Sequence, residues 1–224
     1  MTYSLAIDTA TDVCSVAVFG DDKLLCGRVS PDMRNHASCL SPMIRDVLAD
    51  CGVVPDRVIL SEGPGSYTGL RIGASTAKGL CFGWDIPFVP ISTLQLICAG
   101  VENAENALLC PMIDARRMEV YAALFTPSLH RIGDVNPVII DSGSFHDELE
   151  RGVVIFAGNG SGKCQNVISH PNARFAPDVV PLAQNAIKAL KADKDAQPLM
   201  GTKMAYYEPF YLKEFQTTVS KKRL

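Results

Sequence analysis

The chain has 224 residues, a length that suits two small domains, and 47% of those residues are hydrophobic, which is enough to bury a substantial core. Its 21 Lys and Arg residues against 24 Asp and Glu residues give a formal net charge of −3, which excludes a protein that binds nucleic acid through a generally basic surface. No basic-then-apolar leader opens the chain and no apolar run approaches the length of a membrane-spanning helix, so we expect a cytoplasmic protein with no membrane partner.

The first half of the chain predicts a meander of three strands followed by alternating helices and strands. Short β-rich runs separated by turn residues place the strands at 3–8, 12–19 and 23–29. Apolar side chains recur every three to four residues over 36–51, as in a helix with one buried face, although Pro42 leaves open whether the helix begins there or is longer. The remaining elements are a strand, a helix and a strand, at 57–60, 68–82 and 87–91. The order βββ-α-β-α-β describes an RNase H-like sheet with helices packed on it.

The second half repeats this plan. Its predicted strands lie at 108–114, 119–125, 138–141 and 153–157, and its predicted helices at 144–149 and 181–191. An ungapped alignment of 7–19 with 113–125 matches four residues in 13, among them Asp8 with Asp114. We therefore predict an α/β fold made by duplication of a βββαβα unit, with one lobe at 1–100 and a second at 101–224. The second lobe ends in a basic tail, since 203–224 holds five basic residues and two acidic ones.

The cysteines and histidines predict neither a disulfide framework nor a metal site. The eight cysteines have no C-x-x-C spacing and lie mostly in apolar runs, as small buried side chains do in a reducing compartment. The four histidines have no H-x-x-x-H or H-E-x-x-H spacing, and no G-x-S-x-G motif is present. The residues therefore give little support to an autonomous hydrolase.

Two strand-end carboxylates suggest a nucleotide site. Asp8 and Asp114 would face each other across the cleft of a duplicated kinase-like fold and hold Mg²⁺ and phosphate, with hydroxyl groups from Thr9 and Thr11. The alternative is that each aspartate bonds the backbone of its own tight turn. The bulky side chains after Asp114, at 115–117, weaken the nucleotide interpretation because phosphate loops favour glycine.

Residues 61–80 join a strand to a helix of small residues through a Gly/Pro loop. The backbone N–H groups around Gly63, Gly65 and Ser66 would lie at a helix N-terminus, a common place for an anion to bind. The loop at 157–164 looks similar but is not a phosphate-binding loop, because Ala157 and Cys164 stand where the motif needs glycine and a hydroxyl.

The helix after the Gly/Pro loop carries a stripe of small residues, Gly69, Gly73 and Ala77. Interior glycine costs about 1 kcal/mol relative to alanine, so another part of a protein must approach this stripe closely. Two occupants are open, which are another helix of this chain and a partner chain packed helix on helix.

Several segments together resemble the TsaB (YeaZ) family, bacterial proteins in the pathway that places threonylcarbamoyl on adenosine 37 of tRNA. The segments that carry the resemblance span most of the chain and are Leu5-Ala-Ile-Asp-Thr-Ala-Thr11 with Cys14-Ser-Val-Ala17, His36 with Leu40-Ser-Pro-Met43, Gly63-Pro-Gly-Ser-Tyr-Thr-Gly-Leu-Arg-Ile-Gly73, Pro90-Ile-Ser-Thr-Leu94, Asp114-Ala-Arg116 with Glu119-Val-Tyr121, and Pro209-Phe-Tyr-Leu212. The block at 63–73 is the most specific of them.

The resemblance implies two RNase H-like lobes of the actin/Hsp70/sugar-kinase superfamily and a scaffold subunit with no catalytic residue, no metal and no required cofactor. The related catalytic subunit, TsaD, uses a histidine pair in the segment equivalent to 92–97, which has no histidine here. The implied partners are a TsaD-like subunit that this chain activates, a TsaE-like ATPase, and tRNA reached through the complex. Without them we expect a two-fold homodimer.

The helices at 36–51 and 68–82 are the predicted docking elements. Their predicted interface residues are His36, Leu40, Met43, Val47, Leu70, Gly73, Ala74, Ala77 and Lys78. Two alternatives to a scaffold remain open, which are an ATP-dependent phosphotransferase that binds Mg-ATP through Asp8, Asp114 and the Gly/Pro loop, and a glycoprotease-type metallopeptidase.

Overall fold

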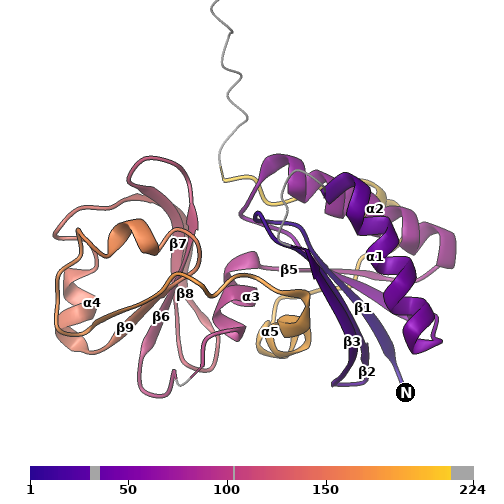
Figure 1. Cartoon of the computed structure of the whole chain (residues 1–224), viewed down its shortest axis with the longest axis horizontal. Helices are drawn as coiled ribbons and strands as arrows, with labels where there is room; N and C mark the ends of the chain where they lie inside the picture. Colours follow the sequence, from indigo (N-terminus) through magenta and orange to yellow (C-terminus); the bar gives the residue numbers. More distant parts are fainter. Residues whose placement is uncertain (31–35, 103, 213–224) are drawn as a thin grey trace, which may run out of the picture.

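Two five-stranded sheets with the same topology stand side by side in the computed structural model, which describes residues 1–30, 36–102 and 104–212 (Figure 1). The strand orders are β3-β2-β1-β4-β5 and β8-β7-β6-β9-β10. In each sheet the first three strands in the chain pair antiparallel, the fourth pairs parallel with the central strand, and the fifth pairs parallel with the fourth. The predicted duplication and two-lobed α/β fold are confirmed.

The strands of the first sheet lie close to their predicted positions. They are β1 Tyr3–Asp8, β2 Cys14–Gly20, β3 Lys23–Ser30, β4 Arg57–Ser61 and β5 Phe88–Ile91. Strands β1 and β2 are almost wholly buried because helices cover both of their faces. The parallel pairing of Ile7 with Leu60 places the ends of β1 and β4 next to each other.

Helices α1 (His36–Cys51) and α2 (Tyr67–Trp84) cover the face of this sheet that points away from the second sheet (Figure 1). Their buried faces form one core cluster with β1, β2 and β4, around Leu5, Val16 and Leu60. Pro42 lies inside α1, so the longer of the two predicted helices is the one that forms. Ser66 caps α2, because its side chain accepts a hydrogen bond from the N–H of Gly69 at 3.3 Å.

Helices α3 (Thr93–Ala99) and α5 (Ala186–Ala192) lie between the two sheets (Figure 1). They share a second core cluster with inward-facing residues of both sheets, including Ile59 and Phe125. This packing makes one continuous core across the middle of the molecule. Helix α3 was not predicted, because its segment was assigned to the boundary between the lobes.

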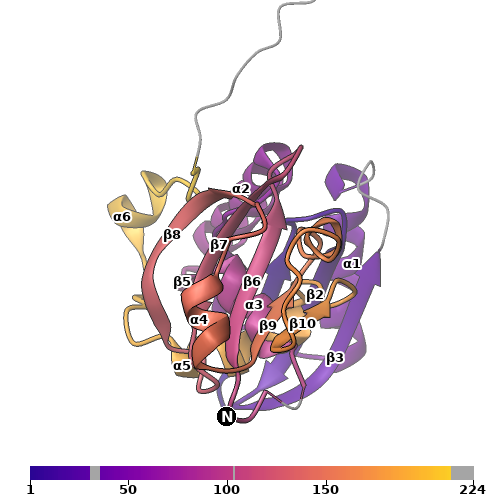
Figure 2. The same ribbon diagram turned by 90° about the vertical axis from the view of Figure 1, so that its left-hand side faces the viewer.

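The second sheet consists of β6 Leu108–Asp114, β7 Glu119–Phe125, β8 Arg131–Ile139, β9 Val154–Ala157 and β10 Ala173–Ala176. Helix α4 (His146–Arg151) lies in front of this sheet in the side view (Figure 2), and its Leu149 belongs to a third core cluster. Between β9 and β10, where the first sheet has α2, the chain makes only a short 3₁₀ turn, Gly162–Cys164. Strand β8 is longer than predicted and β10 was not predicted.

The last described residues return to the first sheet. Leu199 and Phe88 exchange backbone hydrogen bonds of 2.7 and 3.0 Å, and α6 (Gly201–Ala205) packs against α2. The division at residue 100 stays a prediction, and much of the chain beyond 182 contacts elements of the first lobe. Residues 213–224, with most of the predicted basic tail, lie outside the described residues.

Candidate functional site in the glycine loop and its helices

The Gly/Pro loop between β4 and α2 is clamped from two sides. The N–H of Gly63 donates to Thr93 Oγ1 at 3.0 Å, and the N–H of Thr93 donates to the carbonyl oxygen of Gly63 at 2.9 Å. On the other side, the N–H of Phe210 donates to the carbonyl oxygen of Glu62 at 2.8 Å. Gly63 has a φ of 123°, a conformation open to glycine, and a Cβ there would clash with the backbone of Phe210. The loop is therefore fixed between α3 and the C-terminal segment.

The turn after β1 rests directly on the first turns of α2. The N–H of Ser66 donates to the carbonyl oxygen of Ala10 at 2.7 Å, and Thr9 Oγ1 donates to the carbonyl oxygen of Gly69 at 2.8 Å. A Cβ at Gly69 would collide with the Thr9 carbonyl oxygen, and one at Gly73 with Thr9 Oγ1. The small-residue stripe is thus explained by close packing within this chain, against a turn and not against another helix.

Asp8 lies at the centre of this packing and is fully buried. Its Oδ1 accepts a long hydrogen bond of 3.4 Å from the N–H of Ala10, while its Oδ2 and the neighbouring Ser61 Oγ have no hydrogen-bond partner among the described residues. Burial raises the pKa of the Asp8 carboxyl from 3.8 to about 7, against a smaller lowering by hydrogen bonding. A carboxyl held in this way is a structural group, shielded from solvent.

The other groups predicted to bind phosphate are used by the chain itself. Thr11 is buried, and its Oγ1 accepts a 3.4 Å hydrogen bond from the N–H of Val13. A Cβ at Gly65 would clash with the backbone of Ala10, which fills the space beside the helix N-terminus. These residues do not offer a fit for the phosphates of Mg-ATP in this conformation, and nucleotide binding by them stays a prediction.

Asp114 has a different environment from Asp8, although it ends the equivalent strand. It is exposed, its Oδ1 accepts a 2.9 Å hydrogen bond from the N–H of Arg116, and it forms an ion pair with Lys163. Glycines 158 and 160 pack against the end of β6 as the first glycine loop packs against the turn after β1. No hydrogen bond or ion pair among the described residues joins Asp8 to Asp114, so the two carboxylates do not form a shared pair.

Most of the predicted docking residues face the core of the first lobe. Six of them are buried apolar or small residues inside this chain, namely Leu40, Val47, Leu70, Gly73, Ala74 and Ala77. His36 is also buried, with its Nε2 3.4 Å from the carbonyl oxygen of Asp12, and Met43 is half-buried. The apolar period marks the face of each helix that packs on the core of this chain. Because these side chains are buried there, their assignment to a partner surface is corrected.

Lys78 is the polar member of the predicted interface, and it holds the C-terminal segment. Its ammonium donates to the carbonyl oxygens of Ala205 at 2.9 Å and Tyr207 at 2.5 Å. The Nζ atom also lies 5.8 Å from the centre of the Tyr207 ring. Its contacts are therefore made within the chain.

The exposed side of α2 carries a second stripe that the sequence reading missed. The exposed residues of this outer stripe recur at helical spacing and are Thr68, Ser75, Gly79 and Phe82, whereas Ile72 between them is half-buried against the core. Phe82 is 84% exposed, and a Cβ at Gly79 would meet no other atom within 4 Å. The adjacent helix α1 exposes small residues as well, among them Ala37, Ser41 and Ala49. The spacing of Ser75, Gly79 and Phe82, which follows the same helical period as the inner stripe, was the one sequence feature that could have indicated this outer stripe.

Within 1–30, 36–102 and 104–212, no three His, Cys, Asp or Glu side chains come together as a metal site would need. His146 and His170 approach with ring centres 6.4 Å apart, and His170 Nε2 lies 3.1 Å from Glu150 Oε1. In the same part of the chain, no helix combines the length and the apolar character needed to cross a bilayer.

Comparison with known proteins gives a consistent set of relatives. The family described as TsaD, tRNA N6-adenosine threonylcarbamoyltransferase, matches residues 27–142. The chain is 34% identical over 124 residues to the tRNA threonylcarbamoyladenosine biosynthesis protein TsaB of Bacillus subtilis, a match that covers 54% of each protein. It is 32% identical over 158 residues to the Escherichia coli protein of the same name, a match that covers 66% of each. The chain thus spans between half and two thirds of the length of these curated relatives.

Among solved structures, YeaZ from Pseudomonas aeruginosa superimposes with a TM-score of 0.80 at 25% sequence identity. That likeness covers 95% of this chain and 100% of the other. Both lobes and the central helices are therefore common to the two structures.

Proposed function

The chain belongs to the TsaB (YeaZ) branch of the TsaD family of tRNA N6-adenosine threonylcarbamoyltransferases, and from this premise we propose that it is a non-catalytic subunit in the synthesis of threonylcarbamoyladenosine in tRNA. Its role is to bind a TsaD-like catalytic subunit and hold it in the active form. The proposal includes a cytoplasmic location, a TsaE-like ATPase as a further partner, and contact with tRNA through the assembled complex.

The observation that carries the proposal is the exposure of Phe82 on the outer stripe of α2. A phenylalanine that is 84% exposed leaves a large apolar side chain in water, and covering it with another molecule would remove that surface from water at a gain in free energy. The small residues beside it, Ser75 and Gly79, let the backbone of a second helix approach closely. This surface suits helix-on-helix docking.

Helix α1 extends the same surface. It packs against α2 and exposes Ala37, Ser41 and Ala49, while its exposed charges Arg45 and Asp46 form an ion pair with each other at 2.8 Å. A pair of helices that exposes small and apolar side chains can pack closely against a second pair with the same kind of surface. Since the TsaD-like partner belongs to the same family, we propose that it presents an equivalent helix pair, and that two copies of this chain use the surface when the partner is absent.

The groups that would support an autonomous enzyme are buried or bound within the chain. Asp8 has no exposed surface, and the amide of Ser66 is already bonded to Ala10. These contacts favour the scaffold over the phosphotransferase alternative.

The test uses Gly79, where a side chain has free space in the isolated chain. Gly79→Arg adds a long charged side chain to the outer stripe without disturbing the core, and Gly79→Ala is the matched control. We expect Gly79→Arg to abolish co-purification with the TsaD-like subunit of the same organism and to abolish self-association in sedimentation, while Gly79→Ala retains both. Complexes that survive Gly79→Arg would show that the docking surface lies elsewhere.

The biochemical role needs its own measurement. Formation of threonylcarbamoyladenosine in tRNA is followed with the TsaD-like subunit and its other components, with and without this chain. We expect product only when the chain is present, and turnover by the catalytic subunit alone at the same rate would refute the proposed role.

A further inference from the structure

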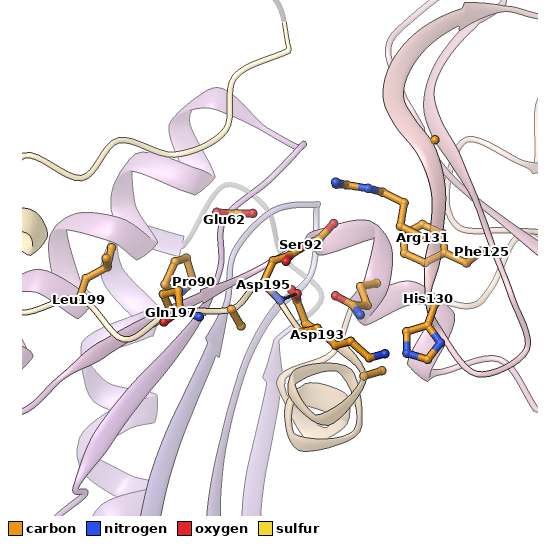
Figure 3. Close-up of a pocket in the computed structure, with 15 residues that line it drawn as sticks. Glu62, Pro90, Ser92, Phe125, His130, Arg131, Asp193, Asp195, Gln197 and Leu199 are labelled. Atoms are coloured by element: carbon orange, nitrogen blue, oxygen red, sulfur yellow. Dashed lines mark hydrogen bonds between the residues drawn. The ribbon is translucent and has the colours of Figure 1, made fainter.

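A cavity of about 550 Å³ opens between the lobes, where the edge strands β5 and β8 and the end of α5 come together (Figure 3). None of the residues of the outer stripe of α2 lines it. Its walls come from both sheets, with Pro90 and Ser92 on one side and Phe125 and Arg131 on the other. The cavity is therefore separate from the proposed docking surface.

Glu62 places a carboxylate on the first-lobe wall of the cavity, and no described residue forms a hydrogen bond or an ion pair with it. The residue is half-buried. Burial raises the pKa of this carboxyl, Asp193 raises it further, and Arg131 lowers it by a smaller amount. A carboxylate in this position is stabilised by any cation that enters the cavity.

Arg131 faces the same space from the opposite lobe. Figure 3 shows its side chain reaching from β8 towards Ser92 and Glu62, with His130 below it. No ion pair within 4.0 Å links the guanidinium to Glu62 or to another described carboxylate. The cavity thus has the unpaired positive group of Arg131 and the unpaired negative group of Glu62 on opposing walls.

The remaining charged residues of the lining are of both signs. Asp193 and Asp195 add carboxylates, and Lys194, which is exposed, adds an ammonium group. His130 lies below Arg131 (Figure 3), and its Nδ1 is 3.0 Å from Ser128 Oγ. Asp193 is partly engaged, because its Oδ1 accepts a 2.9 Å hydrogen bond from the N–H of Asp195. A ligand with only positive charge would be repelled by the guanidinium of Arg131, and a ligand with only negative charge would be repelled by the carboxylates of Glu62 and Asp193.

We propose that this cavity binds a small zwitterion of the free amino-acid class, with its ammonium group against Glu62 and Asp193 and its carboxylate against Arg131. Charge-assisted hydrogen bonds of this kind are about twice as strong as neutral ones, and an arginine fork matches a carboxylate in shape. The volume leaves room for an amino-acid side chain and ordered water. The site stands on its own geometry, whereas the choice of L-threonine as first probe rests on the proposed function.

The experiment titrates the full chain with L-threonine, L-threoninol and N-acetyl-L-threonine, followed by amide chemical shifts and by calorimetry. L-Threoninol lacks the carboxylate and N-acetyl-L-threonine lacks the ammonium, so each removes one half of the proposed contact. We expect saturable binding of the free amino acid, and a loss of affinity of about tenfold or more for each analogue. A panel of other free amino acids then shows which side chain the cavity prefers.

Variants locate the binding. Glu62→Gln keeps the shape of the side chain while removing its charge, and Arg131→Gln replaces the guanidinium by a shorter neutral amide; we expect each to weaken binding about tenfold or more. Glu208→Gln and Arg45→Gln are the controls, because they remove exposed charges that do not line the cavity. Amide spectra of all four variants confirm that they are folded before affinities are compared.

The outcomes separate this proposal from the docking proposal. Absence of saturable shifts with every amino acid, or binding of either analogue as tightly as the free amino acid, overturns the zwitterion site and leaves the co-purification assay unaffected. Binding of another amino acid in place of L-threonine, lost in Glu62→Gln and Arg131→Gln, supports the site.

Discussion

The side chain of Thr9 is hydrogen-bonded to the backbone of Gly69, and the backbones of the two residues are in close contact. Thr9 Oγ1 donates a 2.8 Å hydrogen bond to the carbonyl oxygen of Gly69, and the Thr9 carbonyl oxygen occupies the space where a Cβ on Gly69 would stand. This contact fixes the turn after β1 to the start of α2. It shows why α2 carries glycine at this position, where the Cβ of alanine would collide with the Thr9 carbonyl oxygen.

The first prediction compares two glycines of the same helix. Gly69→Ala forces the Thr9 backbone to move and should lower the free energy of unfolding by about 1–3 kcal/mol. Gly79→Ala meets no atom and should raise it by about 0.5–1 kcal/mol, because alanine loses less backbone entropy in a helix. Urea unfolding of both variants measures the difference, and equal effects would contradict the packing described here.

The second prediction concerns Asp8 and pH. Its carboxyl pKa is raised by burial to about 7, so the folded state holds the proton more tightly than the unfolded state. The resulting stabilisation is complete below pH 3.8 and is lost as the pH rises through about 7, at about 1.4 kcal/mol for each pH unit in between.

Asp8→Asn replaces the carboxyl by a neutral group of the same size, so it should remove that pH dependence. We expect the variant to be more stable than the parent at pH 8 and to show a smaller change in stability between pH 5 and pH 8. Urea midpoints at the two pH values provide the measurement, and parallel pH profiles for parent and variant would contradict the assignment.

The third prediction concerns Lys78 and the C-terminal segment. Lys78→Met removes two hydrogen bonds from an ammonium group to backbone carbonyls, each of a kind worth about 1.5–3 kcal/mol. We expect faster hydrogen exchange and faster proteolytic cleavage over 199–212, with little change in α1. Lys203→Met, at an exposed position in α6, is the control and should leave the segment protected.

The fourth prediction separates the scaffold from the phosphotransferase. Calorimetric titration of the isolated chain with Mg-ATP should show no saturable binding that depends on Asp8, because this carboxyl is buried and the amide of Ser66 is bonded to Ala10. Tight binding that is abolished by Asp8→Asn would favour the enzyme instead.

The sequence predicted elements well where their ends or their buried face are marked locally. Strands β1 and β6 are buried on both faces and have the predicted bounds because turn residues follow them, whereas helix α1 has the predicted bounds because of its amphipathic period. Helix α3 is buried on every side, so it shows no such period. Strand β8 contains Gly133 and Pro137, which read as a loop but are tolerated on an edge strand.

The candidate site was harder to predict than the fold, because α2 carries small residues on both of its faces. The stripe of Gly69, Gly73 and Ala77 faces the core, whereas Gly79 and Phe82 face outwards. Periodicity marks each stripe but does not say which of them is covered by the chain itself. The cavity beside Glu62 and Arg131 joins residues 69 positions apart in sequence, and no local pattern connects them.

The two halves of the duplication differ in one helix, so the two flanks of the molecule are not equivalent. Only the first half follows its fourth strand with a long helix, while the described second half has the short turn Gly162–Cys164 at that point. The proposed helix-on-helix docking surface is therefore available on the first half alone. Under that proposal a two-fold pair uses the surface of both copies, so the duplication does not lead to an open filament.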